Sequence, residues 1–105
     1  MCETSHYLRR SKTVPFRLPL GEVVFMERAV EALAKAGDPA SRFLERHARG
    51  DWGEVCEEDR RRNDDAAVCG RGVASAYTTS AGDKLGVFTA ANRSGTLVLV
   101  LPEKY

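Results

Sequence analysis

The last third of the chain, residues 71–101 (RGVASAYTTSAGDKLGVFTAANRSGTLVLVL), decides the fold. Three runs rich in β-branched and apolar residues, at 71–79, 84–91 and 96–101, are separated by the turn-forming stretches SAGD and NRSG. Connections this short join antiparallel neighbours. The stretch therefore predicts a three-stranded antiparallel meander, with its core face drawn from Val73, Leu85, Val87, Leu97 and Leu99.

Upstream of these strands, the apolar pattern takes the period of a helix. Residues 26–36 place apolar side chains three and four positions apart, and Gly37 is suited to end that helix. A second helix is expected to begin at Asp38 and Pro39 and to end at Gly50. Asp38 is its expected cap.

A third helix is expected to begin at Asp51 and to end at Gly70. Asp51 and Glu54 have the spacing of a capping box, in which each side chain accepts a hydrogen bond from the other residue's backbone. Most of this helix is polar, so only a narrow side of it is expected to touch the core.

These elements predict a single α+β domain over residues 14–105, preceded by an arm at 1–13. A short strand is expected at 20–25, which gives the order β-α-α-α-β-β-β and an antiparallel sheet of three to four strands. The first two helices are expected to cover one face of this sheet, while the third stays exposed to solvent.

Composition narrows the classes of function. The chain has 105 residues, 43% of them hydrophobic and 30% charged, with a formal net charge of +1, so nucleic acid is not an expected partner. No run approaches the ~20 apolar residues of a membrane span, and residues 1–10 lack the apolar core of a secretory signal. A cytoplasmic protein is expected.

The sequence also lacks the common motifs of metal and cofactor sites. The three cysteines, at positions 2, 56 and 69, match neither a disulfide framework nor a paired zinc site. No phosphate-binding glycine loop, dinucleotide fingerprint or zinc-protease motif occurs. No metal and no cofactor are therefore expected.

Several short motifs together carry a resemblance: His47…Gly50-Asp51-Trp52-Gly53, Asp59…Asn63, Gly70-Arg71…Ser75-Ala76-Tyr77, Thr89…Arg93-Ser94…Thr96 and Leu101-Pro102-Glu103-Lys104-Tyr105. In this combination the chain resembles a family of small uncharacterised bacterial proteins, described as plasmid-related and found in chromosomes, plasmids and phages. The resemblance covers about residues 18–105. It implies an accessory protein of a mobile element and transfers no biochemical activity.

The chain departs from that family pattern at several positions. Gly86 stands where relatives carry a tryptophan, Ala90 and Asn92 replace an acid-x-Asp pattern, and a Thr-Thr pair becomes Thr96-Leu97. These departures imply that any activity carried by those acidic or aromatic groups is lost or altered here.

One enzymatic hypothesis rests on four polar residues. An arginine pair, Arg71 and Arg93, together with Ser75 and His47, has the chemistry to hold a phosphodiester in a small metal-independent nuclease. His47 lies near a helix C-terminus and beside Asp51, which predicts a pKa near or above 7 and a role as general acid. The alternative for His47 is a ring that packs on Trp52 and whose nitrogens hold the helix–helix corner together.

The leading hypothesis is a non-enzymatic protein that acts through protein contacts. Residues 51–65 contain seven acids and three arginines, so the third helix is a charged surface. The candidate contact residues are Trp52, Glu57, Glu58, Arg61, Tyr77 and Arg93, although Trp52 also suits corner packing. A third hypothesis is a homodimer that pairs through the free sheet edge. A monomer or homodimer with an unidentified protein partner is thus expected.

Overall fold

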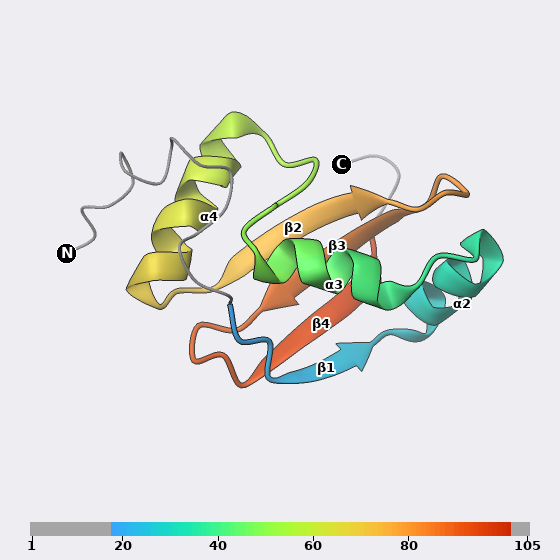
Figure 1. Cartoon of the computed structure of the whole chain (residues 1–105), viewed down its shortest axis with the longest axis horizontal. Helices are drawn as coiled ribbons and strands as arrows, with labels where there is room; N and C mark the ends of the chain where they lie inside the picture. Colours follow the sequence, from blue (N-terminus) through green and yellow to red (C-terminus); the bar gives the residue numbers. More distant parts are fainter. Residues whose placement is uncertain (1–17, 102–105) are drawn as a thin grey trace.

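The computed structural model describes residues 18–101; the predicted arm at 1–13 and the end of the LPEKY motif lie outside this range. The described chain is an α+β unit with the predicted element order (Figure 1). The elements are β1 (Glu22–Phe25), α2 (Glu27–Ala36), α3 (Ala40–Ala48), α4 (Glu57–Cys69), β2 (Val73–Thr78), β3 (Lys84–Thr89) and β4 (Gly95–Val100).

The sheet has the strand order β1-β4-β3-β2. The predicted meander is confirmed, because β3 pairs antiparallel with both β2 and β4. The antiparallel prediction is wrong for β1, which pairs parallel with β4 in the register Val23↔Thr96 and Phe25↔Val98. The three helices return the chain to the end of the sheet where β1 begins, as parallel crossovers do, so β1, β2 and β4 all run the same way.

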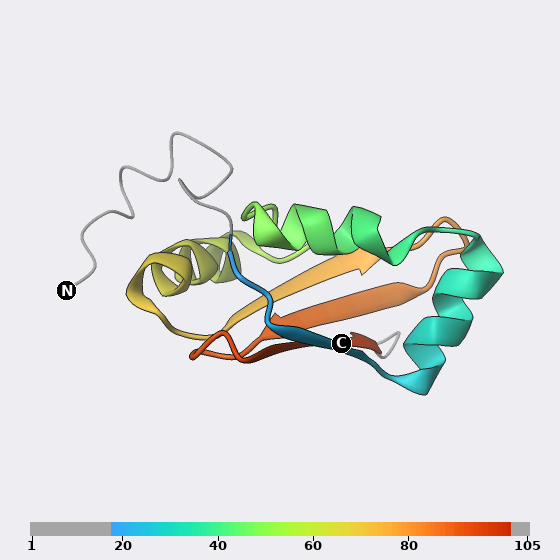
Figure 2. The same ribbon diagram turned by 60° about the horizontal axis from the view of Figure 1, so that its bottom comes forward.

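Only one face of the sheet has a helix over it: α3 lies across that face, with α2 at one end of the sheet and α4 at the other (Figure 2). Strand alternation directs Tyr77, Leu85, Val87 and Val98 toward the helices, where they pack with Phe43 in the main core. Val73 is buried in a second cluster with Trp52, Ala66 and Ala67.

Leu97 and Leu99 do not belong to this core, so the prediction is wrong for them. In β4 the buried residues are Thr96 and Val98, and alternation therefore turns both leucines to the opposite face, where they are half-buried.

Helix α2 ends at Gly37, as predicted, with φ of +72°. Asp38 does not cap α3, contrary to the prediction. Its carboxylate instead accepts hydrogen bonds from the backbone N–H and the hydroxyl of Ser80, both at 2.8 Å. Asp38 therefore fastens the α2–α3 corner to the loop between β2 and β3.

The predicted capping box is also wrong, because α4 begins only at Glu57. Asp51 binds Arg46, with Oδ2 2.8 Å from Nε, and accepts the backbone N–H of Gly53 at 3.2 Å. Glu54 accepts hydrogen bonds from the side chains of Thr78 and Lys84. Both carboxylates thus serve tertiary contacts rather than a helix end.

Residues 51–56 instead lie along the outer edge of β2. Ala76 donates its N–H to the carbonyl of Trp52 at 3.1 Å, and Glu54 donates its N–H to the carbonyl of Ala76 at 2.7 Å. Further along the edge, the Asn63 amide donates to the Ala74 carbonyl at 2.7 Å and accepts the Ala74 N–H at 3.2 Å. These contacts block the β2 edge against pairing with another strand.

Replacing Asn63 with leucine is expected to lower the free energy of unfolding by about 2–3 kcal/mol, because the N–H and C=O of Ala74 lose their partners under a buried side chain. Urea denaturation measures this loss. The matched control is Arg61→Ala on the exposed side of the same helix, with an expected change within about 0.5 kcal/mol. Equal stability of the two variants would contradict this role for Asn63.

Candidate functional site

The residues of the enzymatic hypothesis meet at His47, on the inner side of α3. The His47 side chain has no solvent exposure. Its Nδ1 is hydrogen-bonded to the Ser75 hydroxyl, and its Nε2 lies 2.8 Å from the Thr89 hydroxyl oxygen. Both ring nitrogens are therefore engaged by strand residues, on β2 and β3.

A chain of hydroxyl groups sets the tautomer of His47. Thr96 donates its hydroxyl to the carbonyl of Leu20 at 2.7 Å, so it accepts from Thr89 at 2.8 Å. Thr89 in turn accepts from Nε2–H of His47, which leaves Nδ1 to accept from Ser75. We call these residues, His47, Ser75, Thr89 and Thr96, the buried network. It ties α3 to three strands.

His47 is a neutral imidazole at neutral pH. Burial, together with the positive charge of Arg93, lowers the pKa of His47 to about 4. The prediction of a pKa near or above 7 is wrong, because Asp51 binds Arg46 and the ring faces hydroxyl groups instead. A group with so low a pKa is not the general acid that the hypothesis requires.

Acid is expected to destabilise the fold through His47. The pKa is lower in the folded state than the ordinary value of 6.5, so the unfolded chain binds more protons between the two values. This stabilisation is complete above pH 6.5 and is lost as the pH falls to about 4, for a total of about 3 kcal/mol. Urea unfolding at a series of pH values measures it, with His6→Ala as the reference background. A flat profile over this range would contradict the assignment.

Arg93 is committed to backbone carbonyls. Its guanidinium donates to the carbonyls of Arg71 at 2.7 Å, Ala90 at 2.9 Å and Ala66 at 3.3 Å. Its backbone φ of +61° lies in the left-handed region, whose cost these contacts offset. Arg93 therefore joins the β3–β4 turn to the last turn of α4 and to the approach to β2, and Arg71 takes part through its backbone carbonyl.

Two of the predicted contact residues lie in the interior. Trp52 is buried, donates its indole N–H to Asp64 at 2.9 Å and meets the His47 ring edge-on, with 5.5 Å between ring centroids. Tyr77 is buried too, and its hydroxyl donates to the carbonyl of Asp51 at 2.5 Å. The packing of His47 on Trp52 is therefore as the alternative predicted, but the His47 nitrogens bond to strand residues rather than to the helix–helix corner.

The other predicted contact residues, Glu57, Glu58 and Arg61, are exposed on α4. Their charges are paired along the helix: Arg61 lies 3.4 Å from Glu57, and Arg62 lies 3.8 Å from Glu58 and 2.6 Å from Asp59. Exposed pairs of this kind contribute little and leave little field to attract a partner. The α4 surface is accessible, but its charges are largely balanced locally.

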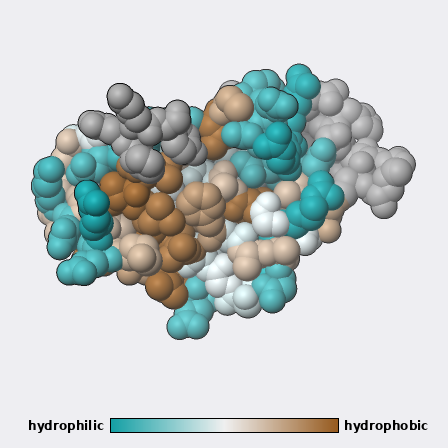
Figure 3. Space-filling view, turned by 180° about the vertical axis from the view of Figure 1, so that it is seen from behind, coloured by the Kyte–Doolittle hydropathy of each residue, from teal (hydrophilic) through white to brown (hydrophobic). Residues whose placement is uncertain are grey.

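A different surface lies on the sheet face that the helices leave open. We define the open face by Val24, Phe88, Leu97 and Leu99, which all point away from the helices. Val24 is 47% exposed and Phe88 38% exposed, and apolar side chains gather on this side (Figure 3). Sequence reasoning missed this surface, although the run LVLV at 97–100 is apolar on both faces and signals a strand with two apolar sides.

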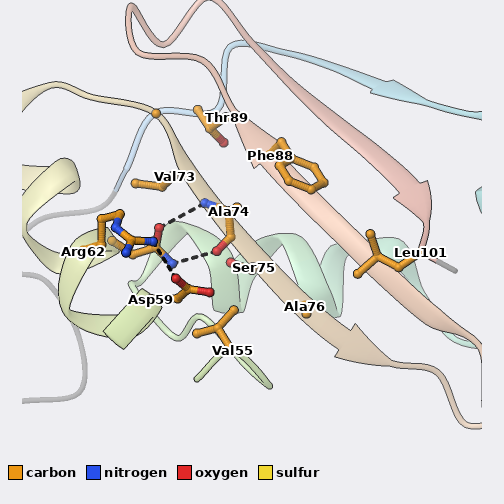
Figure 4. Close-up of a pocket in the computed structure, with 12 residues that line it drawn as sticks. Val55, Asp59, Arg62, Val73, Ala74, Ser75, Ala76, Phe88, Thr89 and Leu101 are labelled. Atoms are coloured by element: carbon orange, nitrogen blue, oxygen red, sulfur yellow. Dashed lines mark hydrogen bonds and ion pairs between the residues drawn. The ribbon is translucent and has the colours of Figure 1, made fainter. Parts of the chain in front are cut away.

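Phe88 stands as a ridge between two depressions on this face. One, of about 410 Å³, lies between α4 and the sheet, with Val55, Asp59 and Arg62 on one wall (Figure 4). The other, of about 580 Å³, extends toward β1 and is lined by residues that include Glu22, Val24 and Leu97. Phe88 contributes to both.

The absence of a side chain at Gly86 lets the Phe88 ring lie against the strand backbone. A Cβ atom at Gly86 would lie 2.8 Å from the Phe88 ring and 2.9 Å from the Leu101 side chain, so these two groups cover the bare backbone of β3. The glycine that departs from the resembled family pattern therefore lies at the centre of this surface.

Comparisons with protein-family models, with curated proteins and with solved structures find no match. The resemblance to plasmid-related proteins therefore stays a prediction. Within residues 18–101, no cluster of three or more His, Cys, Asp and Glu side chains suits a metal ion, and no helix has the length and apolar character to span a bilayer.

Proposed function

We propose that this protein is a non-enzymatic protein-binding module and that the open face is its contact surface. The observation that carries the proposal is the exposure of Val24 and Phe88 on a sheet face with no helix over it. Grouped apolar side chains on a rigid element are typical of protein contact sites, and their burial contributes about 25 cal/mol per Å² of apolar surface.

The environment of the polar residues supports a binding role over the nuclease alternative. A nuclease would need a histidine that reaches its substrate, whereas His47 is buried with both nitrogens bonded. Arg93 is likewise occupied by carbonyl groups. These groups hold the sheet and helices together, and a binding module needs that rigidity behind its contact surface.

An accessory role for a mobile element, implied by the resemblance, is compatible with such a module. In that role the protein would act by occupying a surface of another chain rather than by transforming a substrate. This part of the proposal rests on the resemblance alone.

Site-specific photocrosslinking in cells that make the protein tests the contact surface. The photoreactive residue p-benzoylphenylalanine replaces Phe88 in one sample and exposed Arg61 of α4 in the other. Adducts are expected from position 88 and not from position 61. Adducts from position 61 alone would place the contact surface on α4 and contradict its assignment to the open face. Adducts from neither position would overturn the proposal.

A further inference from the structure

We infer that the occupant of the open face is a second copy of this chain, so that two sheets stack face to face in a symmetric dimer. This inference rests on the proposed function, because it names the partner of the same surface. It follows from the relief of the face and from the charges at its rim, and the size of the face sets the expected strength of the dimer.

The relief is self-complementary. Phe88 and Leu97 are paired across β3 and β4, and the depression toward β1 begins beside them. A two-fold axis parallel to the strands, placed between the two sheets near β3 and β4, sets the Phe88 ridge of each copy over the depression of the other. In this arrangement each copy makes the same contact with the other, as a two-fold interface requires.

The same axis brings opposite charges together at the rim. Glu22 begins β1 at one edge of the sheet, and exposed Arg62 lies beside the opposite edge, near the Asn63 contact to Ala74. Both residues lie toward the same end of the sheet, where β1 and β2 begin. The two-fold axis therefore sets Glu22 of one copy opposite Arg62 of the other, twice per dimer. Because Arg62 also pairs with Asp59 of its own chain at 2.6 Å, this contact favours the register by a modest amount.

The size of the face predicts a weak dimer. Four strands about 4.8 Å apart and about 20 Å long give a footprint of about 400 Å². Two such faces stacked together bury about 800 Å² in total, about half of an interface of standard size and below the roughly 1,000 Å² that stable specific interfaces clear, so the dimer is expected to be transient, with a micromolar or weaker Kd.

Sedimentation of the purified full-length protein over a concentration series that brackets the micromolar range tests the dimer. We expect a shift from the 11.6 kDa monomer to twice that mass. Phe88→Asp is expected to raise the Kd by at least about 30-fold, because it places a charge at the centre of the interface. The matched control is Val30→Asp on α2, which adds the same charge at an apolar residue that is 52% exposed and outside the open face. It should leave the Kd unchanged, and circular dichroism confirms that each variant is folded.

A charge exchange tests the register independently of the apolar core. Glu22→Arg and Arg62→Glu should each weaken the dimer by about 3- to 10-fold, and the double variant should restore it. Two additive losses would overturn this arrangement.

The remaining outcomes separate the inference from the proposed function. A monomer at every concentration, with adducts from position 88 to a different protein, would overturn the second copy and retain the binding module. A monomer without adducts would overturn both. A dimer that tolerates Phe88→Asp but is lost in Val23→Pro, which removes an N–H from the outer edge of β1, would place the contact at that edge and overturn face-to-face stacking.

Discussion

Gly53→Ala is expected to lower the free energy of unfolding by about 4 kcal/mol or to prevent folding, the largest effect of any single methyl group in the described chain. Gly53 has φ of +77°, and a Cβ there would lie 2.1 Å from the Ala76 carbonyl and 2.7 Å from the Tyr77 ring. Neither neighbour has room to move, because Ala76 is paired on both sides and Tyr77 is buried. The segment that covers the β2 edge would have to lift away.

The matched control for this effect is Gly37→Ala. Gly37 has φ of +72°, close to that of Gly53, but a Cβ there meets nothing within 4 Å. It should cost only the backbone strain, about 1 kcal/mol. Thermal and urea unfolding of the two variants separate strain from steric overlap. Equal losses would show that residues 51–56 do not lie against β2 as described.

His47→Ala is expected to cost about 4 kcal/mol at pH 7. The substitution leaves a cavity beside Trp52 and removes the partners of the Ser75 and Thr89 hydroxyls in the interior. It should also reduce the loss of stability between pH 6.5 and 4 by about 3 kcal/mol; the part that remains comes from carboxylates such as Glu54, whose pKa is lowered by its hydrogen bonds with Lys84 and Thr78. Urea unfolding at several pH values measures both effects.

Two single variants measure what each hydroxyl of the buried network contributes to stability. Ser75→Ala and Thr89→Val each remove one hydroxyl partner of His47 and should cost about 1–3 kcal/mol, less than His47→Ala. A His47→Ala protein with the stability of the wild type would contradict the structural role. If that protein had also lost cleavage of RNA, the nuclease alternative would be favoured instead.

The strand order of the C-terminal meander and the helix at 26–36 were predictable because their signals are local. Turn residues separate the three strands, and the apolar spacing before Gly37 is that of a helix. The direction of β1 was not predictable in the same way. Its parallel pairing with β4 depends on where three helices return the chain, which no short stretch of sequence encodes.

The prediction of the candidate site was wrong for a related reason. The prediction for His47 used its neighbours in sequence, Asp51 and the helix end. Its real environment comes from Ser75, 28 residues away, and Thr89, 42 residues away. Burial away from water, together with the positive charge of Arg93, lowers the pKa of His47 instead of raising it.

The open face was missed because exposure is a property of the assembled sheet. Leu97 and Leu99 have the apolar character of core residues, and the sequence does not say which face of β4 the helices cover. Three hydroxyl-bearing residues, Ser75, Thr89 and Thr96, lie on the side of the sheet that faces the helices. His47 supplies the hydrogen-bond partner of Ser75 and Thr89, and Thr96 is bonded to Thr89 and to the carbonyl of Leu20.

The central claim is that the open face, and not the surface of the helices, is covered when this protein associates. Methyl NMR with a soluble paramagnetic probe measures the solvent exposure of Val24, Leu97, Leu99 and Val30 in dilute and concentrated samples. The account predicts that relaxation of the first three weakens as concentration rises, while that of Val30 on α2 stays constant. Relaxation that does not change with concentration at any of the four residues, or protection of Val30 alone, would contradict it.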